Sequence, residues 1–385
     1  VWSYAMYGRM VVQYHADPYR VSPLAFSGDP WFWRVSVWWQ DTRTVYGPAF
    51  TAVSALGMRL AHDSALRARL FFQLLTAASV AAALLLLDRR GAGTGALAFL
   101  GLSPVMVVSV VNGAHNDALV GFAALGAVVA LSGRWRPVAG VALGLGALVK
   151  LIALLPAAAV VLWLWRREGT AAAARLATVL GGVVVGGYLL IGGPSALAPL
   201  QEASRLVNHF SLWGPFGHAT PLSPAGRGPL GGLLISPVHK LWLTGPVRLA
   251  GMLLLAALAG VVMLAASSES RPAAGAGATV LAFVLLTSYI QPWYLAAALP
   301  VLATQWRSRI AFLGAGYSVL LLLGDAWLNS GGLLKTILRL PLATAFPLFQ
   351  LLALAALVAI ALRRLRRVPP STAVLGAAAP VLVSE

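Results

Sequence analysis

Residues 70–87 read LFFQLLTAASVAAALLLL, and this stretch decides the fold class. It carries no charged residue, and its length suits a helix that crosses the bilayer core, which takes about 20 residues. Its apolar residues surround the helix instead of forming one stripe, which indicates an apolar environment on all sides. Similar runs recur along the chain, so the sequence predicts an all-α integral membrane protein.

The composition supports this prediction. The chain has 385 residues, of which 59% are hydrophobic and 10% are charged. Soluble proteins are about one quarter charged, so lipid must solvate most of this surface. Lys and Arg exceed Asp and Glu by 28 to 11, which gives a net charge of +17. In a membrane protein such residues flank helices and set the orientation, so we expect no nucleic-acid partner. Anionic membrane lipids or a phosphate-bearing substrate are further expected partners.

The apolar runs predict a multi-span helical bundle with about eleven spans. The predicted spans are 70–87, 95–112, 117–132, 138–149, 151–165, 173–192, 247–266, 274–290, 293–306, 308–325 and 341–362. The stretch 138–165 could be a hairpin broken near Lys150 or one long tilted helix. Arginines flank both of its ends, and this favours the hairpin because both ends then face the same side.

The short loops predict the orientation, because arginines in such loops prefer the cytoplasmic side. The remaining polar segments then face outward: 1–69, 112–117, 193–246, 291–293 and 326–340. We therefore expect 1–69 to be a first external loop with Trp-rich interfacial helices, because Trp and Tyr favour the membrane interface. Residues 70–367 would form the bundle, with 193–246 as an external loop and 368–385 as a cytoplasmic tail. The chain starts at Val1 without Met, and 1–69 contains no spanning run, so we expect a fragment that lacks its N-terminal helix or helices.

The outward-facing acids are the first candidates for chemistry. Asp17 lies in the sequence His-Ala-Asp-Pro-Tyr, where it could open a turn or act as a general base. The spacing alone favours the turn. Asp41 could cap a helix or pair with Arg43, and it is a minor candidate for the base.

The segment Asn112–Asp117 is the densest polar cluster between two apolar runs. Asn, Gly and Asp form tight turns, and Asp117 could cap the next helix. A turn needs no His115, however, and polar groups near membrane depth usually have a function. This favours a functional role, although His115 and Asp117 alone do not make a metal site.

Three other stretches carry polar residues among apolar ones. Lys150 could extend to the interface or contact a phosphate between helices. The stretch 289–294 joins two apolar runs and could be an aromatic belt with a helix break. Lys240 lies in a Gly- and Pro-rich external segment that is long enough to be a functional loop.

Several short motifs occur in an order that resembles a known family. They are Val1–Met10, Asp17–Tyr19, Tyr46–Pro48, His115–Leu119, Gly144–Lys150 and Gln291–Tyr294. Together they resemble the polyprenol-phosphate-mannose-dependent α-mannosyltransferases of lipomannan and lipoarabinomannan synthesis, in the GT-C superfamily. The resemblance extends over most of the chain, and the order of the motifs is more specific than any one of them.

The resemblance implies a plasma-membrane enzyme whose active site faces outside. The donor would be polyprenyl-phosphate mannose, and the acceptor a growing mannan or lipoglycan. A carboxylate in the first external loop would activate the acceptor hydroxyl, with inversion at the anomeric carbon. Asp17 is the leading base, with Asp117 and Asp41 behind it. In relatives an acid often directly precedes the stretch that matches Val1–Tyr4, and that acid competes for this role.

The departing phosphate needs positive charge or hydrogen-bond donors. The residues expected to bind the donor phosphate or other substrate groups are Arg9, Arg20, His115, Asn116, Lys150, Lys240, Gln291, Trp293 and Tyr294. The lipid-linked sugar is itself a substrate, so we expect neither a cofactor nor an obligatory metal.

Two alternatives stay open at the level of sequence. One is a GT-C enzyme that uses another polyprenyl-phosphate sugar, such as arabinose or glucose, because sugar choice depends on a few hydrogen bonds. The other is a lipid or solute transporter. No inverted repeat is visible, and the polar residues concentrate on one face, and both features argue against a transporter.

Overall fold

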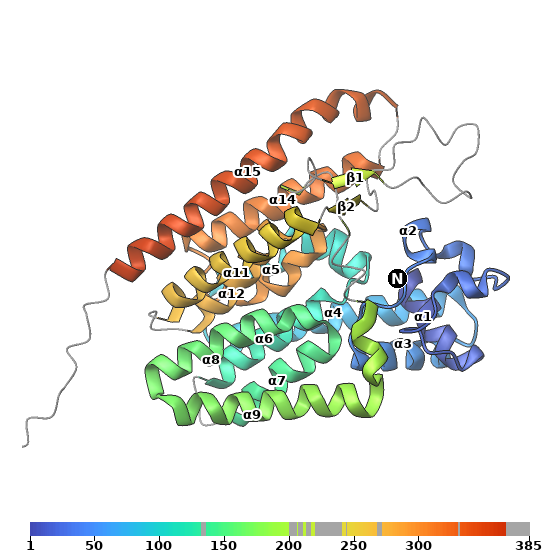
Figure 1. Ribbon diagram of the computed structural model, residues 1–385, viewed down its shortest axis with the longest axis horizontal. Coiled ribbons are helices and arrows are strands. Elements are labelled where there is room, and N and C mark those ends of the chain that lie inside the picture. Colours follow the sequence, from blue (N-terminus) through green and yellow to red (C-terminus); the bar gives the residue numbers. More distant parts are fainter. Residues whose placement is uncertain are drawn as a thin grey trace, which may run out of the picture.

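The computed structural model describes residues 1–131, 136–199, 245–267, 272–329 and 332–366, together with 206, 211–212, 217–219 and 241–243. Nearly all elements in these ranges are helices, as the sequence predicts. Figure 1 shows a bundle of long helices, with the N-terminal segment (blue) packed at one end. The predicted cytoplasmic tail, 368–385, lies outside the described residues.

The N-terminal segment is built on two helices, α1 (Trp2–Tyr14) and α3 (Pro48–Ala61), which pack closely together. Gly8 permits this approach, because a Cβ atom there would lie 2.2 Å from the backbone oxygen of Ser54. Between the two helices lie η1 (Pro23–Phe26), η2 (Phe32–Arg34) and α2 (Val37–Gln40). Tyr4, Tyr46 and Phe50 pack edge to face within this segment, which therefore has its own aromatic core.

Every predicted span falls on one or two helices of the bundle. These elements are α4 (Ala65–Arg89), α5 (Thr94–Gly101), η3 (Val105–Asn112), α6 (Asp117–Leu131), α7 (Arg136–Val149), η4 (Leu151–Ala153), α8 (Leu154–Glu168), α9 (Thr170–Gly187), η5 (Tyr188–Gly192), η6 (Pro194–Leu197), α11 (Gly245–Ser267), α12 (Pro272–Leu286), η9 (Pro292–Ala297), α13 (Leu299–Ala303), α14 (Arg309–Asn329) and α15 (Gly332–Arg366). Alanine, leucine and valine fill the interior between them.

Four helical stretches in the described ranges are long and apolar enough to cross a membrane. They are Ala65–Arg89, Thr170–Gly192, Arg309–Ala326 and Leu348–Leu365. The pair α5 and η3 gives a fifth candidate, bent by 52°, and Pro104 lies at the break, where it cannot continue the hydrogen-bonding pattern. Four other predicted spans contain apolar helical stretches of fewer than 18 residues, namely Asp117–Leu131, Arg136–Val149, Leu249–Val262 and Pro272–Leu286. The test of helix length and hydropathy therefore finds fewer spans than the about eleven expected.

The chain breaks at Lys150, where the sequence predicts the end of a helix. Lys150 has an extended backbone (φ −159°, ψ 128°) between α7 and the turn that begins α8. Arg136 at the start of α7 pairs with Glu168 at the end of α8, so the two helices run in opposite directions. This confirms the hairpin and rejects one long tilted helix.

Two strands of three residues depart from the all-helical prediction. β1 (Gly217–Ala219) and β2 (Leu241–Leu243) pair antiparallel, with His218 opposite Trp242. Both lie within 193–246, the predicted external loop. A pair this short is not an independent sheet, so the architecture remains helical.

A buried ion pair holds the loop after α1 in place. Arg9 Nε donates to Asp29 Oδ2 at 2.6 Å, and the Asp29 side chain is fully buried. The Tyr14 hydroxyl donates to the same oxygen at 2.6 Å, and the Trp31 backbone N–H donates to Oδ1 at 2.7 Å. Burial raises the pKa of Asp29, but these hydrogen bonds outweigh it and leave that pKa below its ordinary value.

Asp29→Asn is expected to destabilise the N-terminal segment by about 3 kcal/mol at neutral pH, because it removes the buried partner of Arg9. A lowered folded-state pKa adds stability above the unfolded pKa and loses it as the pH falls through the folded value. The wild type should therefore lose this contribution below about pH 4, and the variant should lack it. Thermal unfolding followed by tryptophan fluorescence across this pH range measures both effects.

Asp63→Asn is the matched control for this prediction. Asp63 also pairs with Arg9, but its side chain is 69% exposed. Its loss should cost less than about 1 kcal/mol. Equal destabilisation by the two substitutions would contradict the assignment of the stability to the buried pair.

Candidate active site

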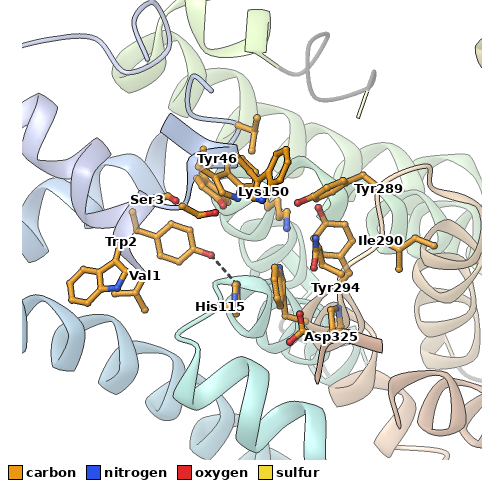
Figure 2. Close-up of a pocket in the computed structure, with 18 of the residues that line it drawn as sticks. Val1, Trp2, Ser3, Tyr46, His115, Lys150, Tyr289, Ile290, Tyr294 and Asp325 are labelled. Carbon is orange, nitrogen blue, oxygen red and sulfur yellow. Dashed lines mark hydrogen bonds between the residues drawn. The ribbon is translucent and has the colours of Figure 1, made fainter. Parts of the chain in front are cut away.

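A cavity of about 510 Å³ lies between the N-terminal segment and the bundle. Figure 2 shows side chains from both parts pointing into it. Its walls come from the start of α1, the loop around α2, the loop before α6, the break at Lys150, the stretch 289–294 and the end of α14. Segments predicted from the sequence to face outward thus meet at one place.

The loop before α6 places His115 against the wall of the cavity. Ala114 adopts a left-handed conformation (φ 57°), which turns the chain between η3 and α6. The His115 ring stacks on Trp293, with centroids 3.6 Å apart and planes 8° apart, and the Tyr4 hydroxyl lies 3.4 Å from its Nδ1. Burial and the nearby Lys150 charge hold the pKa of His115 well below its ordinary value. His115 is therefore a neutral hydrogen-bonding group at neutral pH.

Lys150 supplies a cation to the same cavity. Its Nζ donates to Asp117 Oδ1 at 2.8 Å and lies 4.2 Å from the centroid of the Tyr294 ring. The Asp117 side chain is fully buried, whereas that of Lys150 is 16% exposed. The carboxylate thus holds the ammonium group from behind, while the ammonium faces the cavity (Figure 2).

Some buried polar atoms in and next to the Lys150–Asp117 pair have no hydrogen-bond partner within the described part of the chain. They are Asp117 Oδ2 and both side-chain polar atoms of Asn116. Buried polar groups are nearly always satisfied, so such atoms require an explanation such as water or a ligand. These two residues belong to the polar cluster for which the sequence favoured a function.

The N-terminal segment docks beside Lys150 through Gly47. The Gly47 N–H donates to the backbone oxygen of Val149 at 2.9 Å. A Cβ atom at this position would lie 2.2 Å from the backbone oxygen of Leu148, so a side chain would prevent this approach. The contact places Tyr46 in the cavity wall next to Lys150.

The structure brings together five of the residues predicted as site residues. His115, Lys150, Gln291, Trp293 and Tyr294 line the cavity. Asn116 and Asp117 lie directly behind this lining and are fully buried. The extended backbone of Gln291 and the Pro292 that starts η9 form the predicted break between helices. This break turns Trp293 toward His115 and Tyr294 toward Lys150.

Other predicted site residues lie outside the lining. Asp17 accepts hydrogen bonds from the Tyr19 backbone and from Ser195, at 2.9 Å each, and pairs with Arg20 at 3.3 Å. These contacts fit its interpretation as a turn residue. Asp17 is not among the residues that line the cavity, so the geometry of the cavity does not support its role as the base. Asp41 is exposed and accepts from Ser22 at 3.2 Å. Arg9 is part of the buried ion pair described above, and Lys240 lies outside the described residues.

Sequence reasoning did not select Arg34, Trp38, Trp39 or Asp325, all of which line the cavity. Asp325 is the last residue of the predicted span 308–325, next to the segment 326–340 that is predicted to face outward. The sequence could have pointed to Asp325, because an acid at the end of an apolar run usually has a function. Arg34, whose Cζ lies 5.2 Å from the centroid of the Trp2 ring, carries no such signal in the sequence.

The chemistry available in the lining rests on two cations, Lys150 and Arg34, one carboxylate, Asp325, and several aromatic rings. In the described residues no three His, Asp or Glu side chains group as a metal site would require. Lys150 can neutralise an anion, the rings can pack on a sugar or on an apolar chain, and Asp325 can accept a proton.

Two family descriptions match the chain. "Alpha-(1->6)-mannopyranosyltransferase, N-terminal domain" matches residues 1–167, and "MptB C-terminal domain" matches residues 222–346. The chain belongs to this mannosyltransferase family. A mannosyltransferase relative in Mycolicibacterium smegmatis (strain ATCC 700084 / mc(2)155), named "Probable alpha-(1->6)-mannopyranosyltransferase", is 28% identical over 404 residues, which cover 91% of this chain and 71% of the relative.

The family assignment confirms the resemblance to α-mannosyltransferases, so the protein is a mannosyltransferase rather than a transporter. Both matched regions contribute to the cavity of this mannosyltransferase. The first supplies Tyr4, His115 and Lys150, and the second supplies Trp293 and Asp325. The candidate active site therefore forms only when the two regions pack together.

Lys150→Met and Asp117→Asn should each destabilise the mannosyltransferase, with Lys150→Met costing about 3 kcal/mol because it leaves the Asp117 charge unpaired. The double variant removes both charges and should recover much of that stability. It should not recover mannosyl transfer, which we expect to fall about 100-fold or more in either variant that lacks Lys150. Thermal unfolding and initial rates on the same preparations separate the two effects. Recovery of transfer in the double variant would show that Lys150 has a structural role only.

Proposed function

We propose that this mannosyltransferase moves mannose from polyprenyl-phosphate mannose to a growing mannan or lipoglycan acceptor at the outer face of the plasma membrane. The observation that carries the proposal is the position of Lys150, whose ammonium group faces a cavity at one end of an apolar helical bundle. A lipid-linked phosphate can reach such a site from the membrane while its sugar enters the cavity. The chain contains no Gly-rich phosphate loop of the kind that nucleotide-sugar donors would suggest.

The donor phosphate would bind beside Lys150. Negative charge builds on the leaving phosphate in the transition state, so a preorganised cation stabilises that state more than the ground state. Asp117 fixes the ammonium, and neutral His115 can donate a hydrogen bond without adding a second cation. Arg34 provides another positive charge in the lining. Asn116 and Gln291 would position substrate or water, and Trp293 and Tyr294 would pack against the sugar.

The acceptor hydroxyl would attack the anomeric carbon as the bond to the phosphate oxygen breaks, which inverts that centre. A carboxylate takes the hydroxyl proton. Asp325 is the candidate that lines the cavity, and Asp117 lies behind Lys150. Asp17 and Asp41 remain candidates on sequence grounds. The acid that the resemblance implies directly before Val1 is a further candidate, because Val1 lines the cavity.

The distribution of arginines between the two ends of the bundle supports the proposed orientation. Helix directions place Arg89, Arg136 and Arg309 at the end opposite the cavity. Arginines prefer the cytoplasmic side, so the cavity would face outward. The shorter apolar helices α6, α7 and α12 would then also lie within the membrane, packed against the long spans, in a GT-C-like bundle of about eleven spans.

The test supplies the purified protein with labelled polyprenyl-phosphate mannose and an oligomannoside acceptor. We expect transfer from this donor, and at least about tenfold slower transfer from the arabinose and glucose analogues, whose hydroxyl groups differ. A nucleotide-linked mannose should give no product. Transfer from the nucleotide donor alone would overturn the proposed donor.

The same acceptor tests the orientation, because it does not cross membranes. Right-side-out vesicles that contain the donor lipid should form product without permeabilisation. Activity that appears only after permeabilisation would place the cavity on the cytoplasmic side while leaving the transfer reaction intact.

Carboxylate-to-amide variants identify the base. Asp325→Asn is expected to lower kcat by about 100- to 10,000-fold, the usual contribution of a positioned base. Asp41→Asn tests the minor candidate from the sequence. Asp88→Asn, at an exposed position at the end of α4 away from the cavity, is the matched control and should stay near the wild-type rate. Asp17→Asn belongs in the series, because a loss of kcat at unchanged stability would restore it as the base. EDTA should leave the rate unchanged. Loss of activity in EDTA with recovery on adding a metal would overturn the base mechanism.

A further inference from the structure

A groove of about 520 Å³ lies at the far end of the bundle from the active-site cavity. It runs between the start of α14 and the last turns of α15, which lie side by side (Figure 1). Arg309 lies in the groove and Asp325 in the cavity, about 24 Å apart along α14 at 1.5 Å per residue. The groove is therefore separate from the mannosyltransferase site.

Three arginines gather at this groove from two helices. Arg307 and Arg309 lie around the start of α14, and Arg363 lies near the end of α15. The described lining contains no acidic residue, so the groove carries a concentrated positive charge. The guanidinium of Arg307 lies 4.8 Å from the centroid of the Trp306 ring, which limits its freedom.

Apolar residues continue the groove one turn farther along each helix. Phe312 follows Arg309 by three residues on α14, and Ile360 precedes Arg363 by three residues on α15. Ala356 and Ala359 have small side chains and leave room between the helices. Each helix thus presents a positive end followed by an apolar wall, in the same direction.

We propose that this groove binds an anionic phospholipid. Its phosphate lies among Arg307, Arg309 and Arg363, and an acyl chain follows Phe312 and Ile360 into the bilayer. Both helices belong to the candidate spans Arg309–Ala326 and Leu348–Leu365, so their ends meet the headgroup layer. Basic pockets between spanning helices are well suited to anionic headgroups. The Phe312 side chain is 78% exposed beside the charges, and a free phosphate would make no use of that surface.

Lipid binding to the full chain, measured by native mass spectrometry in detergent, tests this proposal. The probes are phosphatidylglycerol, phosphatidylcholine and inorganic phosphate. Arg309→Gln with Arg363→Gln should weaken phosphatidylglycerol binding about tenfold or more, because two basic groups are lost. Arg89→Gln with Arg175→Gln removes equal charge from the same end but outside the groove, and should change binding less than about twofold.

A second variant separates a lipid from a free anion. Ala359→Trp fills the apolar part of the groove from an exposed position while all the arginines stay in place. It should weaken phosphatidylglycerol binding, and excess inorganic phosphate should not displace the lipid. The proposal is overturned by equal binding of phosphatidylcholine, by equal losses in the two arginine pairs, or by phosphate competition with no effect of Ala359→Trp. None of these readouts depends on mannosyl transfer.

Discussion

The ion pair between Asp117 and Lys150 is the constraint around which the candidate site is arranged. A fully buried carboxylate at the start of α6 requires a cation, and the only ammonium group at its oxygen in the described structure comes from the break after α7. The pair therefore fixes where the hairpin of α7 and α8 meets α6. Gly47 then docks the N-terminal segment on the backbone just before Lys150, which closes one side of the cavity.

Aromatic rings also hold the polar side chains of the cavity in place. Trp293 supports His115 by stacking, and Tyr294 lies against the Lys150 ammonium. Rings lose little conformational freedom when they pack, so the charged and neutral donors of the cavity are held before substrate arrives. Electrostatic stabilisation of a leaving phosphate depends on this kind of preorganisation, because the dipoles then need not reorient during the reaction.

The molecule has two chemically distinct ends. The cavity end combines tryptophans, tyrosines and a single carboxylate-bound lysine, whereas the opposite end carries arginines at several helix termini. Helices that run between the two ends keep these chemistries apart, by about 24 Å along α14 at 1.5 Å per residue. With this separation, the proposed acceptor and the proposed anionic lipid would bind at opposite ends of the same bundle.

The sequence alone determined the helical class, the positions of the helices, the hairpin break at Lys150 and the mannosyltransferase family. These depend on local hydrophobicity, flanking charge and the order of short motifs, all of which can be read along the chain. It also selected His115, Lys150 and Trp293, because polar or aromatic residues between apolar runs stand out.

Only the tertiary structure decided which of these residues lie together around one cavity. The sequence predicts Arg9 as a phosphate ligand, and the structure adds that its buried partner is Asp29, 20 residues away. Asp17 makes the local turn that its sequence predicts, whereas its contact with the distant Ser195 has no signature in the sequence. Asp325 reaches the cavity because α14 ends there, at a position set by packing of distant helices. Local pattern shows which residues can carry charge or hydrogen bonds, but their partners are chosen by contacts between segments far apart in the chain.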